Sequence, residues 1–166
     1  LPEDQLHHDP LLDCLVELTR IHGRPSTRAA LSAGLPLPKI GLTPSLFHRA
    51  ASRAGFASKV VRRPLEKIET VLLPAILLLE GNEACLLMSW ENGGSRAQVL
   101  FPDAGQGSVT ISREMLEERY AGIVICTTNL FHEPDEAALR RFTFKIRFHP
   151  LKPDPRERMF VAEALG

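Results

Sequence analysis

The chain has 166 residues, which is enough for one compact domain with a substantial core and a short appendage. Lysine plus arginine number 20, as do aspartate plus glutamate, and this balance without a long basic run argues against nucleic acid as the main partner. No apolar run is long enough to cross a bilayer, and residues 1–9 lack the features of a signal peptide, so the chain as given is predicted to be soluble.

The three cysteines favour a reducing compartment. Cys14, Cys85 and Cys126 are odd in number, each lies within an apolar stretch, and none belongs to a CxxC pair. A small secreted domain would instead show an even set of cysteines that staple its loops together. We therefore expect buried thiols rather than disulfides, and a location in the cytosol.

Three helices are predicted in the first third of the chain, from a cap residue at the start of each and a glycine at its end. They cover residues 10–22, 27–33 and 44–54. The expected cap residues are Asp9, Ser26 and Thr43. A proline follows both Asp9 and Thr43 at the first helical position, where the helix needs no backbone N–H.

From Phe56 onward the apolar pattern is typical of β-strands. Strands are predicted over residues 56–61, 75–79, 84–90, 97–101, 109–111 and 123–127. Asn92-Gly93 marks a hairpin, and a helix is predicted from Ser112 until Gly122 breaks it. Helices followed by a mostly antiparallel sheet indicate the α+β class. The alternating segment 142–148 predicts either an edge strand or a linker.

Cys14 offers one hypothesis for nucleophilic catalysis. A thiol peptidase needs a cysteine, a histidine base and a group that orients the histidine, and Cys14 could act with His22 or His48. However, Cys14 lies beside the apolar stripe of its helix, and no cation or helix N-terminus is near it in the sequence to lower its pKa. A buried, unreactive thiol is therefore the favoured interpretation.

No metal or nucleotide site is predicted. His7 and His8 could bind a metal ion weakly with Asp4 and Asp9, but adjacent histidines near a flexible end are more often incidental. The sequence contains no P-loop, dinucleotide-binding, serine-hydrolase or HExxH motif.

Aromatic residues are the candidates for contact with a partner. Trp90 stands immediately before the predicted hairpin turn, and its place at a strand end makes partial exposure plausible. Phe47 and Phe101 are the other candidates, although most aromatic residues belong to the core. A partly exposed tryptophan is a common anchor in protein interfaces.

Several short segments occur in an order typical of one family. They are Asp9–Leu15, Ile21–Gly23, Gly41–Thr43, Gly55-Phe56, Leu73–Ile76, Phe101–Gly105, Ser112–Tyr120 and Gly122. Together, over residues 9–128, they resemble the N-terminal domain of ABC transporters that carry a bacteriocin-leader peptidase. The resemblance implies a papain-like cysteine-peptidase fold, with N-terminal helices packed on a mostly antiparallel sheet.

The resemblance also implies that the catalytic residues are missing. The nucleophilic cysteine of the family falls on Pro10, its histidine falls within residues 82–84, where Glu83 stands, and its orienting aspartate falls on Phe101. Cys14 falls on a second cysteine of the family that is not catalytic. Because the members of a triad act as a unit, the resemblance implies a domain that is not an enzyme.

This pattern resembles the degenerate peptidase-like domains of type I secretion exporters for RTX adhesins and haemolysin-type toxins. The resemblance implies binding of an unfolded passenger protein at the cytoplasmic face of the bacterial inner membrane, with Pro10, Glu83, Trp90 and Phe101 as candidate contacts. The transporter's own membrane and nucleotide-binding domains are further expected partners. No cofactor is expected in this domain, whereas the full-length transporter would use ATP and magnesium.

The expected organisation has three parts. Residues 1–8 form a flexible tail, residues 9–132 form the peptidase-like domain, and residues 133–166 form a linker toward a transmembrane domain. Two alternatives to passenger binding stay open at this point. One is a structural or regulatory domain that contacts its own transporter, and the other is a divergent cysteine peptidase that uses Cys14.

Overall fold

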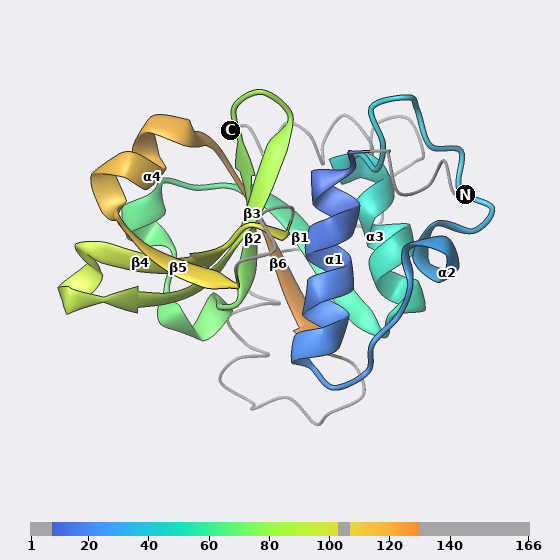
Figure 1. Ribbon diagram of the computed structural model, residues 1–166, viewed down its shortest axis with the longest axis horizontal. Helices are drawn as coiled ribbons and strands as arrows, with labels where there is room; N and C mark the ends of the chain where they lie inside the picture. Colours follow the sequence, from blue (N-terminus) through green and yellow to red (C-terminus); the bar gives the residue numbers. More distant parts are fainter. Residues whose placement is uncertain (1–7, 103–106, 130–166) are drawn as a thin grey trace, which may run out of the picture.

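The computed structural model describes residues 8–102 and 107–129 and has an α+β architecture. Three helices come first and lie side by side (Figure 1): α1 (Pro10–Ile21), α2 (Arg28–Ser32) and α3 (Pro44–Arg53). The strands follow: β1 (Phe56–Arg62), β2 (Ala75–Leu79), β3 (Glu83–Glu91), β4 (Arg96–Leu100), β5 (Ser108–Ser112) and β6 (Tyr120–Asn129). The 3-10 turns η2 (Leu65–Lys67), η3 (Thr70–Leu72) and η4 (Asn92–Gly94) and the helix α4 (Arg113–Arg119) complete the domain.

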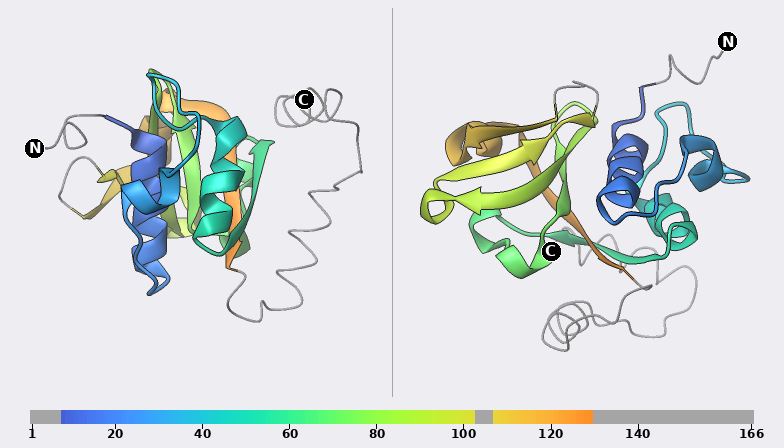
Figure 2. Two further views of the ribbon diagram at one scale, coloured as in Figure 1. Left: turned by 90° about the vertical axis from the view of Figure 1, so that its right-hand side faces the viewer. Right: turned by 60° about the horizontal axis from the view of Figure 1, so that its bottom comes forward.

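The six strands form one sheet in the order β1-β6-β2-β3-β4-β5, and every neighbouring pair is antiparallel. The helices α1 and α3 pack on the part of the sheet made by β1, β2 and β3. The hairpin β4–β5 and the helix α4 lie at the opposite side of the molecule (Figure 2). The predicted class, helices packed on an antiparallel sheet, is confirmed.

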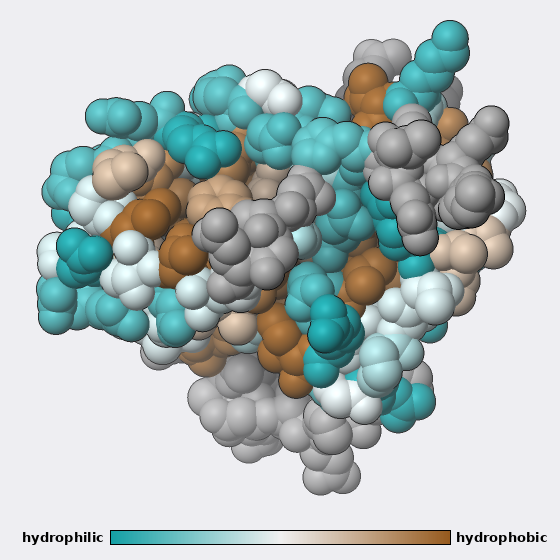
Figure 3. Space-filling model, in the orientation of Figure 1, coloured by the Kyte–Doolittle hydropathy of each residue, from teal (hydrophilic) through white to brown (hydrophobic). Residues whose placement is uncertain are grey.

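The sheet carries a core on each of its faces, because successive strand residues point to opposite sides. The helix-side core holds the strand residues Ile76, Leu86 and Ile125 together with buried residues of α1 and α3. The far-side core holds their sequence neighbours Leu77, Leu87 and Val124 together with Leu65, Leu72 and Leu116 from the short helices. Figure 3 shows that the face seen in Figure 1 is mostly hydrophilic, with apolar residues in small separate patches.

The cap residue of α2 differs from the prediction. The helix begins at Arg28, and Thr27 rather than Ser26 accepts a hydrogen bond from the backbone N–H of Ala30. The backbone N–H of Ser26 instead donates to the hydroxyl of Thr19, which ties the loop back to α1. Sequence alone could not choose between two adjacent hydroxyl residues, because this bond to α1 fixes the start of the helix.

Thr43 is the N-cap of α3, as predicted, but Gly122 behaves differently from the prediction. Thr43 makes no side-chain cap bond, and its hydroxyl contacts the hydroxyl of Ser45 instead. Gly122 does not separate a helix from a strand, since β6 begins at Tyr120 and runs through it. Gly122 has a φ of 89°, and the pairing of β2 with β6 shifts between Leu77 and Leu79, so the glycine accommodates an irregular stretch of strand.

The other predicted elements are present within one or two residues, and Gly23 and Gly55 have the positive φ angles expected after a helix. Residues 1–7, 103–106 and 130–166 lie outside the described residues, and with them the predicted N-terminal tail, the 142–148 strand and the linker. Within the described residues, no helix has both the length and the apolar character to cross a membrane.

Candidate functional site

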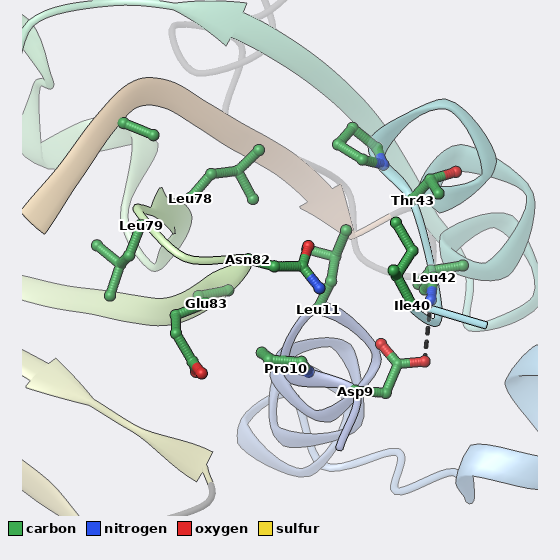
Figure 4. Close-up of a pocket in the computed structure, with 13 residues that line it drawn as sticks. Asp9, Pro10, Leu11, Ile40, Leu42, Thr43, Leu78, Leu79, Asn82 and Glu83 are labelled. Carbon is green, nitrogen blue, oxygen red and sulfur yellow. Dashed lines mark hydrogen bonds between the residues drawn. The ribbon is translucent and has the colours of Figure 1, made fainter. Parts of the chain in front are cut away.

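A small cavity lies between the N-terminus of α1, the loop before α3 and the turn that joins β2 to β3 (Figure 4). Its volume is about 170 Å³, and most of its lining is apolar. The lining residues are Asp9, Pro10, Leu11, Ile40, Leu42, Thr43, Pro44, Leu78, Leu79, Asn82, Glu83, Ala84 and Ala121. Since drug-sized ligands need about 300 Å³ or more, this volume suits a side chain or a short stretch of polypeptide.

Asp9 fixes one wall of the cavity. Its carboxylate accepts a hydrogen bond from the backbone N–H of Leu12 at 3.2 Å and another from the backbone N–H of Leu42 at 2.9 Å. The first bond caps α1, as the sequence predicts, and the second ties the loop before α3 to that cap. Asp9 is 2% exposed, so both backbone donors are held away from water, and the loop has one defined position over the helix start.

Gly41 allows this close approach. A Cβ atom on Gly41 would lie 2.5 Å from the carboxylate of Asp9, and the φ of Gly41 is 96°, where residues with a side chain are strained. The neighbouring Ile40 is 58% exposed at the cavity edge. This loop was not among the predicted site residues, although a glycine after the Pro-rich segment 35–40 was the available signal.

The opposite wall comes from the β2–β3 turn. Asn82 has a φ of 59°, and its carboxamide reaches toward the start of α1 and the Ile40–Leu42 loop (Figure 4). The carboxylate of Glu83 points away from that loop. Glu83 lies 2.9 Å from Nε2 of His8, a contact that is an ion pair when the histidine is protonated. The cavity is therefore bordered by hydrogen-bonding groups from two distant parts of the chain.

Two of the four predicted site residues meet at this cavity. Pro10 is the first residue of α1 and lines one wall, and Glu83 lines the other, 73 positions later in the chain. Among the lining residues, all of which belong to the described part of the chain, there is no cysteine and no histidine. At the place where a helix N-terminus could favour a thiolate, the residue is a proline, which has no group that can ionise.

Trp90 and Phe101 lie elsewhere. Both pack against the far-side core and neither lines the cavity. The indole N–H of Trp90 donates to the carbonyl oxygen of Ile68 at 2.9 Å, which fastens the segment before β2 to the end of β3. The guanidinium of Arg119 lies 5.3 Å from the centre of the Phe101 ring. Whether these two aromatic residues bind a passenger stays a prediction, but a single cleft does not contain all four candidates.

Cys14 is in the helix-side core with an exposed fraction of 0%, and it does not line the cavity. The ring of His22 packs edge-on against Phe56, with the ring centres 5.1 Å apart. Nδ1 of His48 lies 3.0 Å from the carbonyl oxygen of Ser45 on the exposed side of α3. A peptide bond of a substrate has no access to the thiol of Cys14 in this arrangement.

The other thiols are also buried, and the three cysteines form no disulfide. Burial raises the pKa of Cys85 to about 12, and the positive charge of Arg119 offsets this only in part. Burial likewise raises the pKa of Tyr120, and a negative charge on Cys126 would add to the increase, whereas Arg63 opposes it. These groups stay protonated at neutral pH, so Cys85 does not supply a thiolate nucleophile.

Of the four residues considered as metal ligands near the N-terminus, the structure describes His8 and Asp9. Asp4 and His7 lie outside the described residues. The carboxylate of Asp9 already accepts two backbone hydrogen bonds, and His8 contacts Glu83. Within residues 8–102 and 107–129, no group of three or more potential ligands is placed to hold a metal ion.

The sequence was compared with models of known protein families. The model of the peptidase C39 family matches residues 3–131, which is most of the chain. The chain belongs to the peptidase C39 family. No curated protein matches this C39 domain.

Solved structures agree with this assignment. The C39 domain is similar, at 39% identity and a TM-score of 0.69, to the N-terminal peptidase C39 like domain of the toxin secretion ATP-binding protein from Vibrio parahaemolyticus. That similarity covers 74% of this chain and 98% of the Vibrio domain. The peptidase domain of Streptococcus ComA, a bi-functional ABC transporter, has 17% identity and a TM-score of 0.61 over 73% of this chain and 91% of its own. A double glycine motif protease from an AMS/PCAT transporter, in complex with its leader peptide, has 18% identity and a TM-score of 0.59 over 72% and 83% of the two chains.

Proposed function

We propose that this C39 domain is a non-catalytic part of a type I secretion ABC transporter and binds an unfolded passenger protein, of the RTX adhesin or toxin kind, for export. It would act at the cytoplasmic face of the bacterial inner membrane. ATP and magnesium would be used by the nucleotide-binding domains of the full-length transporter, and no cofactor is assigned to this domain. The identity of 39% with a domain of a toxin secretion protein supports this choice of transporter.

The observation that carries the proposal is the meeting of Pro10 and residues 82–84 at one cavity. The family resemblance aligns the nucleophile with Pro10 and the histidine base with this short segment. Two positions that are far apart in sequence would come together at an active site if that alignment is right, and here they do. Pro10, Asn82, Glu83 and Ala84 cannot provide a thiolate and an imidazole base, so the cavity lacks the groups for the family's chemistry, and the role that we propose for it is binding alone.

The form of the cavity supports binding of an extended polypeptide. It is apolar on most of its wall, and it is bordered by the carboxamide of Asn82 and the carboxylate of Glu83, which can pair with backbone or basic groups. Such a site would hold one apolar side chain of a passenger at a time. Binding would be weak, because an unfolded partner loses conformational freedom when it docks.

The two other functions explain the structure less well. A divergent peptidase that uses Cys14 is disfavoured because this thiol is buried away from the cavity. A regulatory domain that contacts its own transporter is compatible with the same cavity, but it requires no affinity for an isolated passenger. Passenger binding is therefore the property to measure.

The test is an NMR titration of the labelled chain with the unfolded, calcium-free segment of a candidate passenger. We expect shifts at the amides of Leu11 and Ala84, beside the cavity. Glu83→Arg places a longer side chain of opposite charge at the cavity edge and should weaken binding by about tenfold or more. Glu91→Arg makes the same change at the other end of β3, where the side chain is exposed, and should leave binding unchanged.

Three results would contradict the proposal or part of it. Absence of shifts at high passenger concentration would exclude passenger binding and favour contacts with the transporter's own domains. Shifts centred on Trp90 and Phe101, with Glu83→Arg binding normally, would move the binding face to the far side of the sheet. Cleavage of a passenger or of a double-glycine leader peptide by the purified chain would show that the domain is a peptidase.

A further inference from the structure

The charges of this domain are unevenly divided between its two halves. No aspartate or glutamate occurs between Glu17 and Glu66. The same stretch contains nine basic residues: Arg20, Arg24, Arg28, Lys39, Arg49, Arg53, Lys59, Arg62 and Arg63. Residues 66–119 have the opposite bias, with nine acidic and four basic residues. The neutral total charge thus hides a positive stretch, residues 18–65, which runs from α1 to the end of β1, and a negative stretch, residues 66–119.

Part of this positive charge is neutralised locally. Arg20 lies 2.9 Å from Glu17, and Arg28 lies 2.8 Å from Asp13, both through side chains of α1. Lys59 is buried on β1 with an exposed fraction of 3%. These three cations therefore add little to the field outside the molecule.

Exposed cations also occur on α3 and in the loop before it, and we call this surface the basic face. It consists of the exposed side chains of Lys39, Arg49 and Arg53, with the exposed His48 on the same helix. On α3, residues 48, 49, 52 and 53 are all exposed, which is the spacing of one helical face, and Phe47, Ala50 and Ala51 are buried behind it.

The basic face spans α3 and the loop between α2 and α3. Nη1 of Arg53 donates to the carbonyl oxygen of Leu31 at 3.4 Å, so α2 and α3 lie next to each other. Figure 2 shows α2, α3 and the loop between them on one side of the molecule, turned toward the viewer in the left-hand view. Of the residues on the basic face, none lines the cavity. A dispersed positive surface of this kind fits a partner that is itself broad and evenly negative.

The chain also continues from this side of the domain. Asn129, the last residue of β6, pairs with Phe56, which follows the end of α3 by only three residues. Figure 1 shows the end of β6 beside the start of β1. Whatever follows residue 129 therefore starts close to Arg53. In a transporter, the following segment leads toward the membrane domain, which brings the basic face near a bilayer.

We infer that the basic face rests against the anionic headgroups of phospholipids at the membrane surface. The inference relies on the proposed function only for the nearness of a membrane. Each Lys or Arg close to an anionic surface contributes about fivefold to the partition coefficient, and the effect falls off within a Debye length. When a bilayer stays within reach of the domain, even a weak attraction can favour one orientation of the domain, with the basic face toward the lipid.

An acidic polypeptide is the competing partner, and the structure favours it less. The cavity that can hold polypeptide is at the start of α1 and is bordered by Asp9 and Glu83, which would repel an acidic chain. The residues of the basic face do not line this cavity. Binding to a lipid surface requires no pocket in the protein, only exposed positive charges that can reach the headgroups together.

The test is cosedimentation of the full chain with vesicles of phosphatidylcholine containing phosphatidylglycerol, with pure phosphatidylcholine vesicles as the neutral reference. We expect binding only to the anionic vesicles, and a steep loss of binding as the salt concentration rises. Lys39→Glu/Arg49→Glu should lower the partition coefficient by about 30-fold or more, because at least two attractive charges are removed. Both side chains are exposed, so the variant should fold, which its thermal unfolding curve will show.

The matched control is Lys67→Glu/Arg96→Glu, which changes the net charge equally but within the stretch 66–119, and it should bind like the unchanged chain. Equal binding of all three proteins, or equal binding to neutral vesicles, would overturn the inference. Binding of poly-glutamate but not of anionic vesicles, again lost in Lys39→Glu/Arg49→Glu, would assign the basic face to an acidic polypeptide instead. Because Glu83→Arg leaves the basic face unchanged, failure of lipid binding and failure of passenger binding can be told apart.

Discussion

Both faces of the sheet carry a core of buried apolar residues, but the two cores hold different parts of the domain in place. The helix-side core holds α1, α2 and α3 on the sheet and borders the cavity at its edge. The far-side core contains Cys85, Cys126 and the partly buried Trp90, and it is closed by short helices and the β4–β5 hairpin. The described cavity, which is small and mostly apolar, lies on the helix side, where the start of α1 and the loop before α3 meet the β2–β3 turn.

The largest expected effect comes from removing one large side chain from each core. Phe47 and Leu87 are both 0% exposed, Phe47 on the helix side and Leu87 on the far side. Phe47→Ala should lower the free energy of unfolding by about 3–5 kcal/mol and Leu87→Ala by about 2–5 kcal/mol. In urea unfolding followed by both circular dichroism and Trp90 fluorescence, each variant should show one shared transition. Separate transitions for the two probes would mean that the two cores unfold independently.

A smaller effect should distinguish the cavity loop from an ordinary turn. Gly41→Ala places a Cβ atom 2.5 Å from the Asp9 carboxylate at a positive φ, and should lower the free energy of unfolding by more than about 2 kcal/mol. Gly81→Ala, in the β2–β3 turn, also has a positive φ but meets nothing within 4 Å, and should cost only about 1 kcal/mol. Equal losses in denaturant titrations would show that the Asp9 contact does not hold the loop.

The far-side core should also confer a specific sensitivity to alkali. Because burial raises the pKa of Cys85 from 9.0 to about 12, the unfolded chain loses this proton at lower pH than the folded chain. Stability from this group is complete below pH 9 and should fall as the pH rises from 9 toward 12, by about 1 kcal/mol per unit. Cys85→Ala should flatten this part of the curve in urea titrations at a series of pH values. An unchanged slope in Cys85→Ala would assign the alkaline loss to other groups, such as Tyr120.

Local chemistry in the sequence determined the elements of this protein. Asp9 and Pro10 predict the start of α1, Asn92-Gly93 predicts the hairpin, and Ser112 predicts the start of α4, since caps and tight turns depend on a few adjacent residues. The ordered motifs also predict the family, which the comparison confirms. The prediction of Ser26 instead of Thr27 as the cap of α2 was wrong. The two hydroxyl residues are adjacent, and a contact between Ser26 and the distant Thr19 determined which of them caps the helix.

Only the tertiary structure decided what these elements do together. Pro10 and Glu83 line one cavity, although they are far apart in the sequence. Trp90 and Phe101 pack against the core on the other face of the sheet. The face to which a strand residue points depends on the register of the strand and not on the residue type. The stretch without acidic residues could be counted in the sequence. That Arg49 and Arg53 lie on one outer surface follows only from the packing of α3, which buries Phe47, Ala50 and Ala51 and turns the opposite helical face to the solvent.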